Sequence, residues 1–229
     1  MPPVAILAGG LATRMRPITE KIPKSLISVA GEAFIFHQLR LLKKRGVHRV
    51  VLCVSYLGEM IEAKVGDGSL FGLEISYSYD GEQLLGTAGA LKKALPQLGD
   101  VFFVTYGDSY LSCDYEAVYE RYQQSGQSAL MTIYRNENLH DVSNIILKNG
   151  KIVCYDKVNH VPQMQYIDYG LGILCRRLVD RLEPAKPYDL ADIYMNLVKN
   201  GELACFVSPE RFYEIGSPAG LNELSNILR

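Results

Sequence analysis

Two hydrophobic periods alternate along the first half of this chain. Short apolar runs rich in β-branched residues, or runs of alternating polarity, are typical of strands. They start at Val4 and span Arg49–Val54, Glu74–Tyr79 and Val101–Tyr106. Apolar residues at helical spacing occupy Phe34–Arg45, Thr87–Leu95 and Tyr115–Gln124. This strand–helix alternation predicts a parallel sheet with helices on both faces, whose ligands bind at the carboxyl ends of the strands.

After Ser128 the pattern changes to closely spaced strands. The runs with strand character are Ser128–Tyr134, Asn144–Leu147, Ile152–Tyr155, Leu171–Cys175 and Leu203–Val207. Asn149-Gly150 between two of these runs predicts a hairpin. Helices are expected over Leu190–Lys199 and from Pro218. Because no repeat or linker interrupts the chain, we expect one α/β domain over residues 1–229, with a β-rich subdomain from about residue 128.

Composition excludes several classes of function. The chain has 229 residues and a net charge of −1, and its basic residues are dispersed, so no nucleic-acid footprint is expected. No apolar run is long enough to span a membrane, and no signal-like segment precedes the first strand. The five cysteines form no C-x-x-C pair and the four histidines lack ligand spacing. These features favour free thiols in a cytoplasmic protein.

The richest chemistry follows the first strand. Gly9 and Gly10 let the backbone approach a ligand, while Thr13, Arg14 and Lys24 add a hydroxyl and two positive charges. This combination predicts a phosphate-binding loop. The third glycine of the dinucleotide fingerprint and the Gly-Lys-Ser/Thr order of a Walker loop are both missing.

Asp108 is a second candidate. It follows the strand Val101–Tyr106 directly after Gly107, where a carboxylate suits either a divalent metal ion or the capping of a turn. The small residues of Leu85–Leu91 suit either a ligand-facing helix start or tight packing on the sheet.

Together these motifs resemble the sugar-1-phosphate nucleotidyltransferase family. The loop resembles its G-G-x-G-T-R-x-x-P…P-K pattern, with Ala12 in place of a glycine, and Leu85–Leu91 spells L-G-T-A-G-A-L. Gly107-Asp108 resembles the family's metal-binding Gly-Asp, and Tyr155-Asp156-Lys157 its aromatic-E-K. Tyr166–Gly170 stands where the family has N-A/G-G, and Glu214 stands at a metal-binding aspartate. The resemblance implies a GT-A-like fold with a Rossmann-like, mostly parallel sheet.

The resemblance also assigns the site residue by residue. It implies catalytic roles for Arg14, Lys24 and Asp108, and a magnesium ion held by Asp108 and Glu214. The residues implied in nucleotide binding are Leu7, Ala8, Gly9, Gly10, Thr13, Arg14, Lys24, Glu82, Gly86, Thr87 and Asp108. Those implied in sugar-phosphate binding are Asn144, Asp156, Lys157, Asp168 and Tyr169. Residues 1–127 would thus bind the nucleotide and residues 128–229 the sugar.

The implied reaction joins an NTP and a sugar 1-phosphate into an NDP-sugar and pyrophosphate. We favour GTP and a neutral, hydroxyl-rich pyranose of the mannose or heptose type, because an ionised Asp168 accepts hydrogen bonds and disfavours anionic sugars. A uridylyltransferase for an amino sugar, a cytidylyltransferase for a non-sugar phosphate and a non-enzymatic nucleotide-sugar-binding subunit stay open. No nucleic-acid or membrane partner is expected, and the oligomeric state, a homo-oligomer included, is open.

Overall fold

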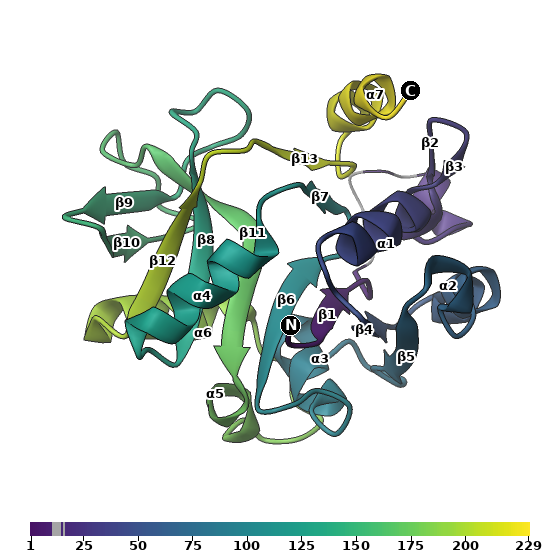
Figure 1. Cartoon of the computed structure of the whole chain (residues 1–229), viewed down its shortest axis with the longest axis horizontal. Helices are drawn as coiled ribbons and strands as arrows, with labels where there is room; N and C mark the ends of the chain where they lie inside the picture. Colours follow the sequence, from purple (N-terminus) through teal and green to yellow (C-terminus); the bar gives the residue numbers. More distant parts are fainter. Residues whose placement is uncertain (11–14, 16) are drawn as a thin grey trace.

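The computed structural model describes residues 1–10, 15 and 17–229. Within them one large sheet runs through the molecule, with strand order β10-β9-β11-β6-β1-β4-β5, and β8 and β12 join it beside β11 (Figure 1). Strands β1, β4, β5 and β6 are mutually parallel, whereas β11 lies antiparallel to β6. The expected α/β fold with a parallel central sheet and flanking helices is confirmed.

The strands and helices follow the hydrophobic patterns closely. The strands are β1 Val4–Leu7, β2 Ser28–Val29, β3 Glu32–Ala33, β4 Arg49–Val54, β5 Glu74–Tyr79, β6 Val101–Tyr106, β7 Ser109–Leu111, β8 Ala129–Arg135, β9 Ile145–Lys148, β10 Lys151–Tyr155, β11 Tyr166–Cys175, β12 Leu203–Ser208 and β13 Phe212–Glu214. The helices are α1 Phe34–Lys44, α2 Gly58–Val65, α3 Gly86–Ala94, α4 Tyr115–Ser125, α5 Arg176–Asp180, α6 Leu190–Asn200 and α7 Pro218–Ile227, with 3₁₀ turns η2 Ile18–Glu20, η3 Lys24–Leu26 and η4 Ser69–Phe71.

Consecutive strand residues point to opposite sides of the sheet. Because the residues on both sides are apolar, helices cover both faces. Ala5 packs into a cluster with residues of α3, α5 and α6, whereas its neighbours Val4 and Ile6 pack with residues of α1, α2 and α4. A third, smaller cluster joins α7 to the segment around β2 through Ile215, Leu224 and Val29. The last helix is thereby held near the amino-terminal part of the chain (Figure 1).

Strand β11 connects the parallel half of the sheet to the β-rich half. It is longer than the predicted run and pairs with β6 on one side and β8 on the other. Its register with β8 shifts between Asp168 and Gly172, so the chain bulges there, with Gly170 at φ +93°. A bulge re-aims side chains beside a site.

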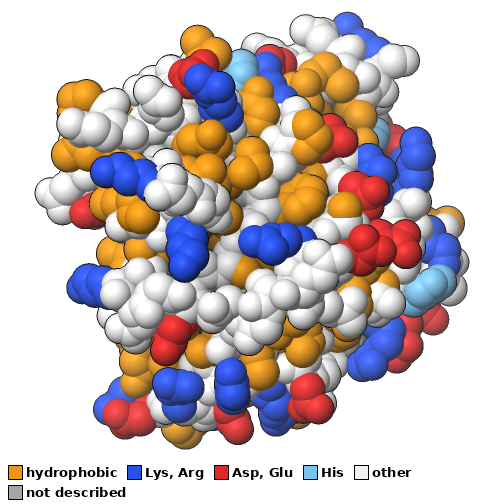
Figure 2. All heavy atoms as spheres, turned by 60° about the vertical axis from the view of Figure 1, so that its left-hand side comes forward, with side chains coloured by type: hydrophobic (Ala, Val, Ile, Leu, Met, Phe, Trp, Pro, Cys, Tyr) orange, Lys and Arg blue, Asp and Glu red, His pale blue; other side chains and the backbone are white. Residues whose placement is uncertain are grey.

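The surface shows no large region of one charge in the view of Figure 2. Acidic and basic side chains are scattered among hydrophobic ones over the face that carries β9 and β10. Among the described residues, no helix combines the length and the apolar character that crossing a membrane requires.

Candidate active site

A cavity of about 240 Å³ opens at the carboxyl ends of the parallel strands. Its walls come from the segments that follow β1, β5 and β6, from β4, from η3 and from the start of α3. The lining residues are Leu7, Ala8, Gly9, Gly10, Lys24, Ser25, Cys53, Asp80, Leu84, Gly86, Thr87, Ala90, Tyr106, Gly107 and Asp108. Eight residues predicted to bind nucleotide are therefore among them, namely Leu7, Ala8, Gly9, Gly10, Lys24, Gly86, Thr87 and Asp108.

Lys24 and Asp108 form an ion pair in this cavity. Lys24 Nζ lies 2.8 Å from Asp108 Oδ2, and the side chains are 17% and 27% exposed. Lys24 begins η3, while Asp108 lies in the two-residue turn between β6 and β7. The turn is anchored by Gly107 N–H, which donates to Leu7 O at 2.9 Å. The structure thus joins two predicted catalytic groups from distant parts of the sequence.

Glu214 approaches the same point from the other side. A Cβ atom on Gly216 would lie 2.5 Å from Glu214 Oε2, 3.4 Å from Lys24 Nζ and 3.5 Å from Asp108 Oδ2, so these groups surround one glycine. Strand β13 brings Glu214 there by pairing it with Ser109 of β7. Glu214 also accepts hydrogen bonds from Gly216 N–H and, at 2.7 Å, from Ser217 Oγ.

These two carboxylates fit a hard divalent cation. Magnesium prefers oxygen ligands and binds through one or two carboxylates together with water and substrate phosphates. Asp108 and Glu214 supply that number of carboxylates. The described residues contain no cluster of three or more histidine, cysteine or acidic side chains that could enclose a metal ion by themselves.

The glycine loop closes against β4. Ala8 N–H donates to Cys53 O at 2.8 Å, and Ser55 Oγ donates to Gly9 O. A Cβ on Gly9 would lie 3.0 Å from Ser55 Oγ, whereas one on Gly10 would meet nothing within 4 Å. A side chain at position 9 would therefore crowd Ser55, whereas position 10 faces open space. Thr13 and Arg14 lie outside the described residues.

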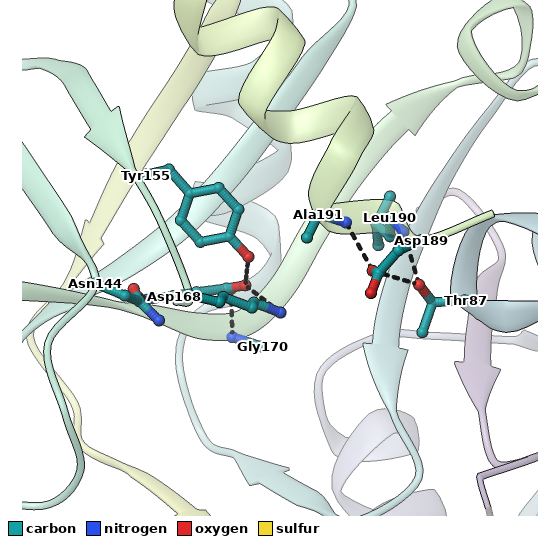
Figure 3. Close-up of polar contacts among 9 residues, drawn as sticks. Thr87, Asn144, Tyr155, Asp168, Gly170, Asp189, Leu190 and Ala191 are labelled. Atoms are coloured by element: carbon teal, nitrogen blue, oxygen red, sulfur yellow. Dashed lines mark hydrogen bonds and ion pairs between the residues drawn. The ribbon is translucent and has the colours of Figure 1, made fainter. Parts of the chain in front are cut away.

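The start of α3 is packed tightly against the segment before α6. Ala88 N–H donates to Tyr188 O at 2.9 Å, and a Cβ on Gly86 would lie 2.6 Å from the same oxygen. Thr87 Oγ1 donates to Asp189 Oδ1 at 2.9 Å and accepts from Leu190 N–H at 2.7 Å (Figure 3). The interpretation of Leu85–Leu91 as a helix start whose N–H groups face a ligand is therefore corrected for Ala88, whose N–H is already used.

Glu82, which the resemblance implies in nucleotide binding, does not reach the cavity, but its neighbour Asp80 does. The Glu82 side chain is exposed. Asp80 Oδ2 accepts from Leu85 N–H at 3.3 Å, and burial raises the pKa of the Asp80 carboxyl. Asp80 directly follows β5, and a polar residue at the carboxyl end of a predicted parallel strand was the available signal.

A second polar cluster lies beside the cavity, centred on Asp168 (Figure 3). The Asp168 side chain is 9% exposed; Oδ2 accepts from Tyr155 Oη at 3.1 Å and lies 3.8 Å from Lys157 Nζ. Gly170 N–H donates to Oδ1 at 3.0 Å. Asn144 Oδ1 accepts from Asp168 N–H at 3.0 Å. Asn144, Lys157 and Asp168, all predicted to bind the sugar phosphate, are thus brought together.

Tyr106 lies between the cavity and the polar cluster around Asp168. It lines the cavity, and Lys157 Nζ lies 5.7 Å from the centre of its ring. Burial raises the pKa of the Tyr106 hydroxyl well above its ordinary value, and nearby acidic groups, Asp168 first among them, raise it further. The hydroxyl therefore stays neutral next to the acidic groups.

Two predicted sugar-site residues have other surroundings. Asp156 is half-buried and accepts from the N–H groups of Val158 and Asn159 at 2.8 and 2.9 Å, which lowers the pKa of its carboxyl and fixes the following turn. Tyr169 is 2% exposed and packs in the cluster with α1, α2 and α4. Since neighbouring residues of a strand point to opposite faces, the ring lies across the sheet from Asp168. The structure does not bring the Tyr169 ring to this site.

Comparison with known proteins places these features in a family. A family model described as Nucleotidyl transferase matches residues 4–142. The chain belongs to this family. Over 213 residues it is 31% identical to the UTP–glucose-1-phosphate uridylyltransferase of Synechocystis sp., covering 86% of this chain and 55% of that protein. The chain thus spans only part of the length of this curated relative.

Other relatives in the family differ in nucleotide and sugar. The chain is 27% identical over 219 residues to the mannose-1-phosphate guanylyltransferase catalytic subunit beta of Xenopus tropicalis, covering 93% of this chain and 61% of that protein. It is 41% identical over 116 residues to the N-acetylmuramate alpha-1-phosphate uridylyltransferase of Neisseria meningitidis, covering 50% of each. The fold is similar to that of HddC from Yersinia pseudotuberculosis, solved with GMP-PN, with a TM-score of 0.84, 23% identity and 100% of both chains covered.

Proposed function

We propose that this chain transfers a nucleotidyl group from an NTP to a sugar 1-phosphate and releases pyrophosphate. The Lys24–Asp108 pair carries the proposal, because it lies in the cavity at the carboxyl ends of the parallel strands, beside the glycine loop. The Lys157–Asp168 cluster adjoins the cavity across Tyr106, which suits a second, phosphorylated substrate. The relatives named above act on nucleotides and sugar 1-phosphates, which supports the same assignment.

In the proposed reaction, an oxygen of the sugar phosphate attacks the α-phosphorus of the NTP. A new P–O bond forms as the bond to the bridging oxygen breaks, and pyrophosphate leaves with that electron pair. Such a transfer depends mainly on positioning and charge neutralisation. Lys24 would contact the α-phosphate and Lys157 the incoming phosphate, while Arg14 would stabilise the departing pyrophosphate. A magnesium ion held by Asp108 and Glu214 would neutralise phosphate charge.

The base we propose is guanine, and Asp80 would read it. A carboxylate only accepts hydrogen bonds when ionised, and guanine presents two adjacent N–H donors on its Watson–Crick edge. Uracil presents one N–H donor between two carbonyl oxygens, which a carboxylate would repel. Because Asp80 lines the cavity that we assign to the nucleotide, its charge favours GTP over UTP.

For the sugar, the structure supports a neutral pyranose. Asp168 is already bound to Tyr155, Gly170 and Lys157, so its main effect on a substrate would be electrostatic. A buried carboxylate in this position opposes a second negative charge beyond the phosphate that Lys157 neutralises. We therefore propose a hydroxyl-rich sugar 1-phosphate, such as mannose 1-phosphate.

A second candidate is uridylyl transfer to an N-acetylated amino-sugar 1-phosphate. The N-acetylmuramate alpha-1-phosphate uridylyltransferase, 41% identical over half of this chain, favours it. The two candidates share the site and the chemistry, and they differ in the base that Asp80 meets and in the sugar.

A pyrophosphate-release screen tests both candidates. Four NTPs are paired with glucose, mannose, heptose, N-acetylglucosamine and N-acetylmuramate 1-phosphates. We expect GTP with mannose or heptose 1-phosphate to give the highest kcat/KM. If UTP with an amino-sugar phosphate gives the highest value, the second candidate is correct. No pyrophosphate from any pair contradicts nucleotidyl transfer itself.

Asp80→Asn provides a sharper test of the base. An amide offers one donor and one acceptor, which fits uracil better than guanine. We expect kcat/KM for GTP to fall by about 10- to 100-fold, as for the loss of one good base contact, while that for UTP stays level or rises. Glu82→Gln, at the exposed neighbouring acid, is the matched control and should change neither value.

A further inference from the structure

Gln38 is a polar residue on the buried face of α1. The buried side chains of this helix are Phe34, Ile35, Gln38, Leu39, Leu41 and Leu42, so the amide interrupts an otherwise apolar stripe. Gln38 is 3% exposed. Burying an amide costs free energy unless it forms hydrogen bonds, so the contacts of this side chain show what it does in the fold.

Both N–H groups of the Gln38 amide are used on one turn. Nε2 donates to Tyr106 O at 2.8 Å and to Ser109 O at 2.9 Å. These carbonyls immediately precede and follow Gly107-Asp108. Gln38 Oε1 is buried and has no hydrogen-bond partner among the described residues. The two bonds donated by Nε2 are therefore the polar contacts that this side chain makes with them. Exchanging the amide oxygen and nitrogen would set oxygen against two carbonyl oxygens, which fixes the orientation.

The turn makes two further backbone hydrogen bonds, one through each of its residues. Gly107 N–H donates to Leu7 O, and Ile215 N–H donates to Asp108 O at 3.0 Å. A Cβ on Gly107 would lie 2.9 Å from Ala8 Cβ, so the turn has little room to shift towards β1. Without the Gln38 amide, two partly buried carbonyls would lose these donors, which favours rearrangement of the turn.

We propose that Gln38 is a positioning residue that holds the Gly107–Asp108 turn and so sets where the Asp108 carboxylate points. The inference rests on the proposed function, in which Asp108 holds a divalent cation. Small displacements of a catalytic group are costly: about 1 Å can cost 10²-fold in rate. Gln38 lies outside the cavity lining, and its hydrogen bonds to Tyr106 O and Ser109 O connect it to the turn that carries Asp108.

The test compares wild type with Gln38→Met, which keeps the length and removes the donors. Mn²⁺ is the probe, and its binding to the protein is measured by electron paramagnetic resonance, without turnover. We expect Mn²⁺ affinity to fall at least tenfold and kcat to fall about 10- to 100-fold, while KM for the sugar 1-phosphate stays within twofold. Gln38→Asn, too short to reach both carbonyls, should show the same direction if Gln38→Met does not fold.

Two controls separate positioning from general destabilisation. Leu42→Val removes a methylene from the same buried face of α1 and keeps the Gln38 amide, and should leave Mn²⁺ affinity unchanged. In an Asp108→Asn background, Gln38→Met should have little further effect on residual kcat, because the two changes act through one carboxylate.

Several outcomes would overturn the inference. They are Mn²⁺ affinity within twofold of wild type in both Gln38 variants, additive effects with Asp108→Asn, or wild-type protein that binds no Mn²⁺. Failure of the proposed function looks different, because wild type would then bind Mn²⁺ normally and release no pyrophosphate from any substrate pair.

Discussion

Lys24 shows what a single side chain contributes at this site. Its ammonium group lies 2.8 Å from Asp108 and is only partly exposed. In the proposed reaction the same charge would compensate the α-phosphate as negative charge develops there. The ion pair holds Lys24 in the cavity before substrate arrives, so little rearrangement is needed on binding.

Lys24→Ala should lower kcat by about 10²–10³-fold, as expected for the loss of one charged contact to the transition state. The chain should stay folded, because the change removes one partly exposed side chain from the cavity wall and no apolar packing from the core. Steady-state kinetics and thermal unfolding check the two statements. Lys21→Ala, at an exposed lysine nearby, is the control and should retain normal kcat. A Lys24→Ala variant with normal kcat would contradict the role.

Gly216 is a second position where a single added atom, a Cβ, would change the site. A Cβ there would lie 2.5 Å from Glu214 Oε2, closer than van der Waals contact allows, so Gly216→Ala must displace that carboxylate. We expect kcat to fall at least tenfold and the Mg²⁺ concentration for half-maximal rate to rise. Gly99→Ala serves as control, because its nearest neighbour would be 3.9 Å away. Equal Mg²⁺ dependence in the two variants would exclude Glu214 from metal binding.

At the scale of elements, α3 links the cavity to the segment that leads into α6. In its first turn, Ala88 N–H donates to Tyr188 O. Thr87 Oγ1 donates to Asp189 and accepts from Leu190 N–H at the start of α6. A Cβ on Gly89 would lie 2.7 Å from Lys186 O and 3.0 Å from Leu85 Cβ. The small residues of this helix are therefore explained by close packing on residues 186–189.

Gly89→Ala makes that explanation testable. In an ordinary helix this change stabilises by up to about 1 kcal/mol, since alanine has the higher helix propensity. Here we expect a loss of about 1–3 kcal/mol from overpacking. Urea denaturation measures the free energy of unfolding. An increase in stability would show that the segment 186–189 moves aside without cost.

Elements with an apolar pattern of their own were predictable from the sequence, whereas elements that depend on pairing with a distant segment were not. Strands β4, β5 and β6 have the predicted bounds because each run carries its own apolar pattern. Strands β7 and β13 have three residues each and form by pairing with one another, Tyr110 with Tyr213, so neither segment alone carries a pattern. Long-range pairing decides such short strands.

The surroundings of the site residues also depend on distant parts of the chain. Asp108 was predictable because it closely follows β6, and the sheet brings strand ends together. Lys24 was indicated by the motif resemblance, and it reaches the same cavity from η3. Thr87 lines the cavity as predicted, but its hydroxyl bonds Asp189, 102 residues away. The Asp156 carboxylate accepts a hydrogen bond from Val158 N–H in the loop that follows it. The Tyr169 ring packs in the core, because side chains of β11 alternate between the two faces of the sheet. Motif letters give position along the chain, while the direction of a side chain depends on its neighbours in space.

At the scale of the whole molecule, the reactivity of the cysteine thiols indicates whether the sheet stays closed around them. Cys53 lies in the cavity wall, and burial raises the pKa of its thiol to about 12, so almost no thiolate exists at pH 8. Burial likewise raises the pKa of Cys113 to about 12. Cys154 and Cys175 are partly exposed. Reactivity towards alkylating reagents follows the thiolate fraction and access.

Iodoacetamide at pH 8 should therefore modify Cys154 and Cys175 first in the native protein. Cys53 and Cys113 should react only after unfolding, because both access and thiolate are lacking before it. Mass spectrometry of peptides from native and urea-unfolded samples checks this order. Rapid native labelling of Cys53 would show that the cavity wall opens.

The pairing of β7 with β13 places residue 214 beside residue 108 and residue 24. A protein is synthesised from its amino end, so the phosphate loop and the Gly107–Asp108 turn exist long before β13 does. A growing chain on the ribosome can build the parallel strands and their helices, yet it lacks Glu214, the second carboxylate of the proposed site. Under the proposed function, nucleotide chemistry would thereby be withheld from unfinished chains, and a nascent chain would consume no triphosphate.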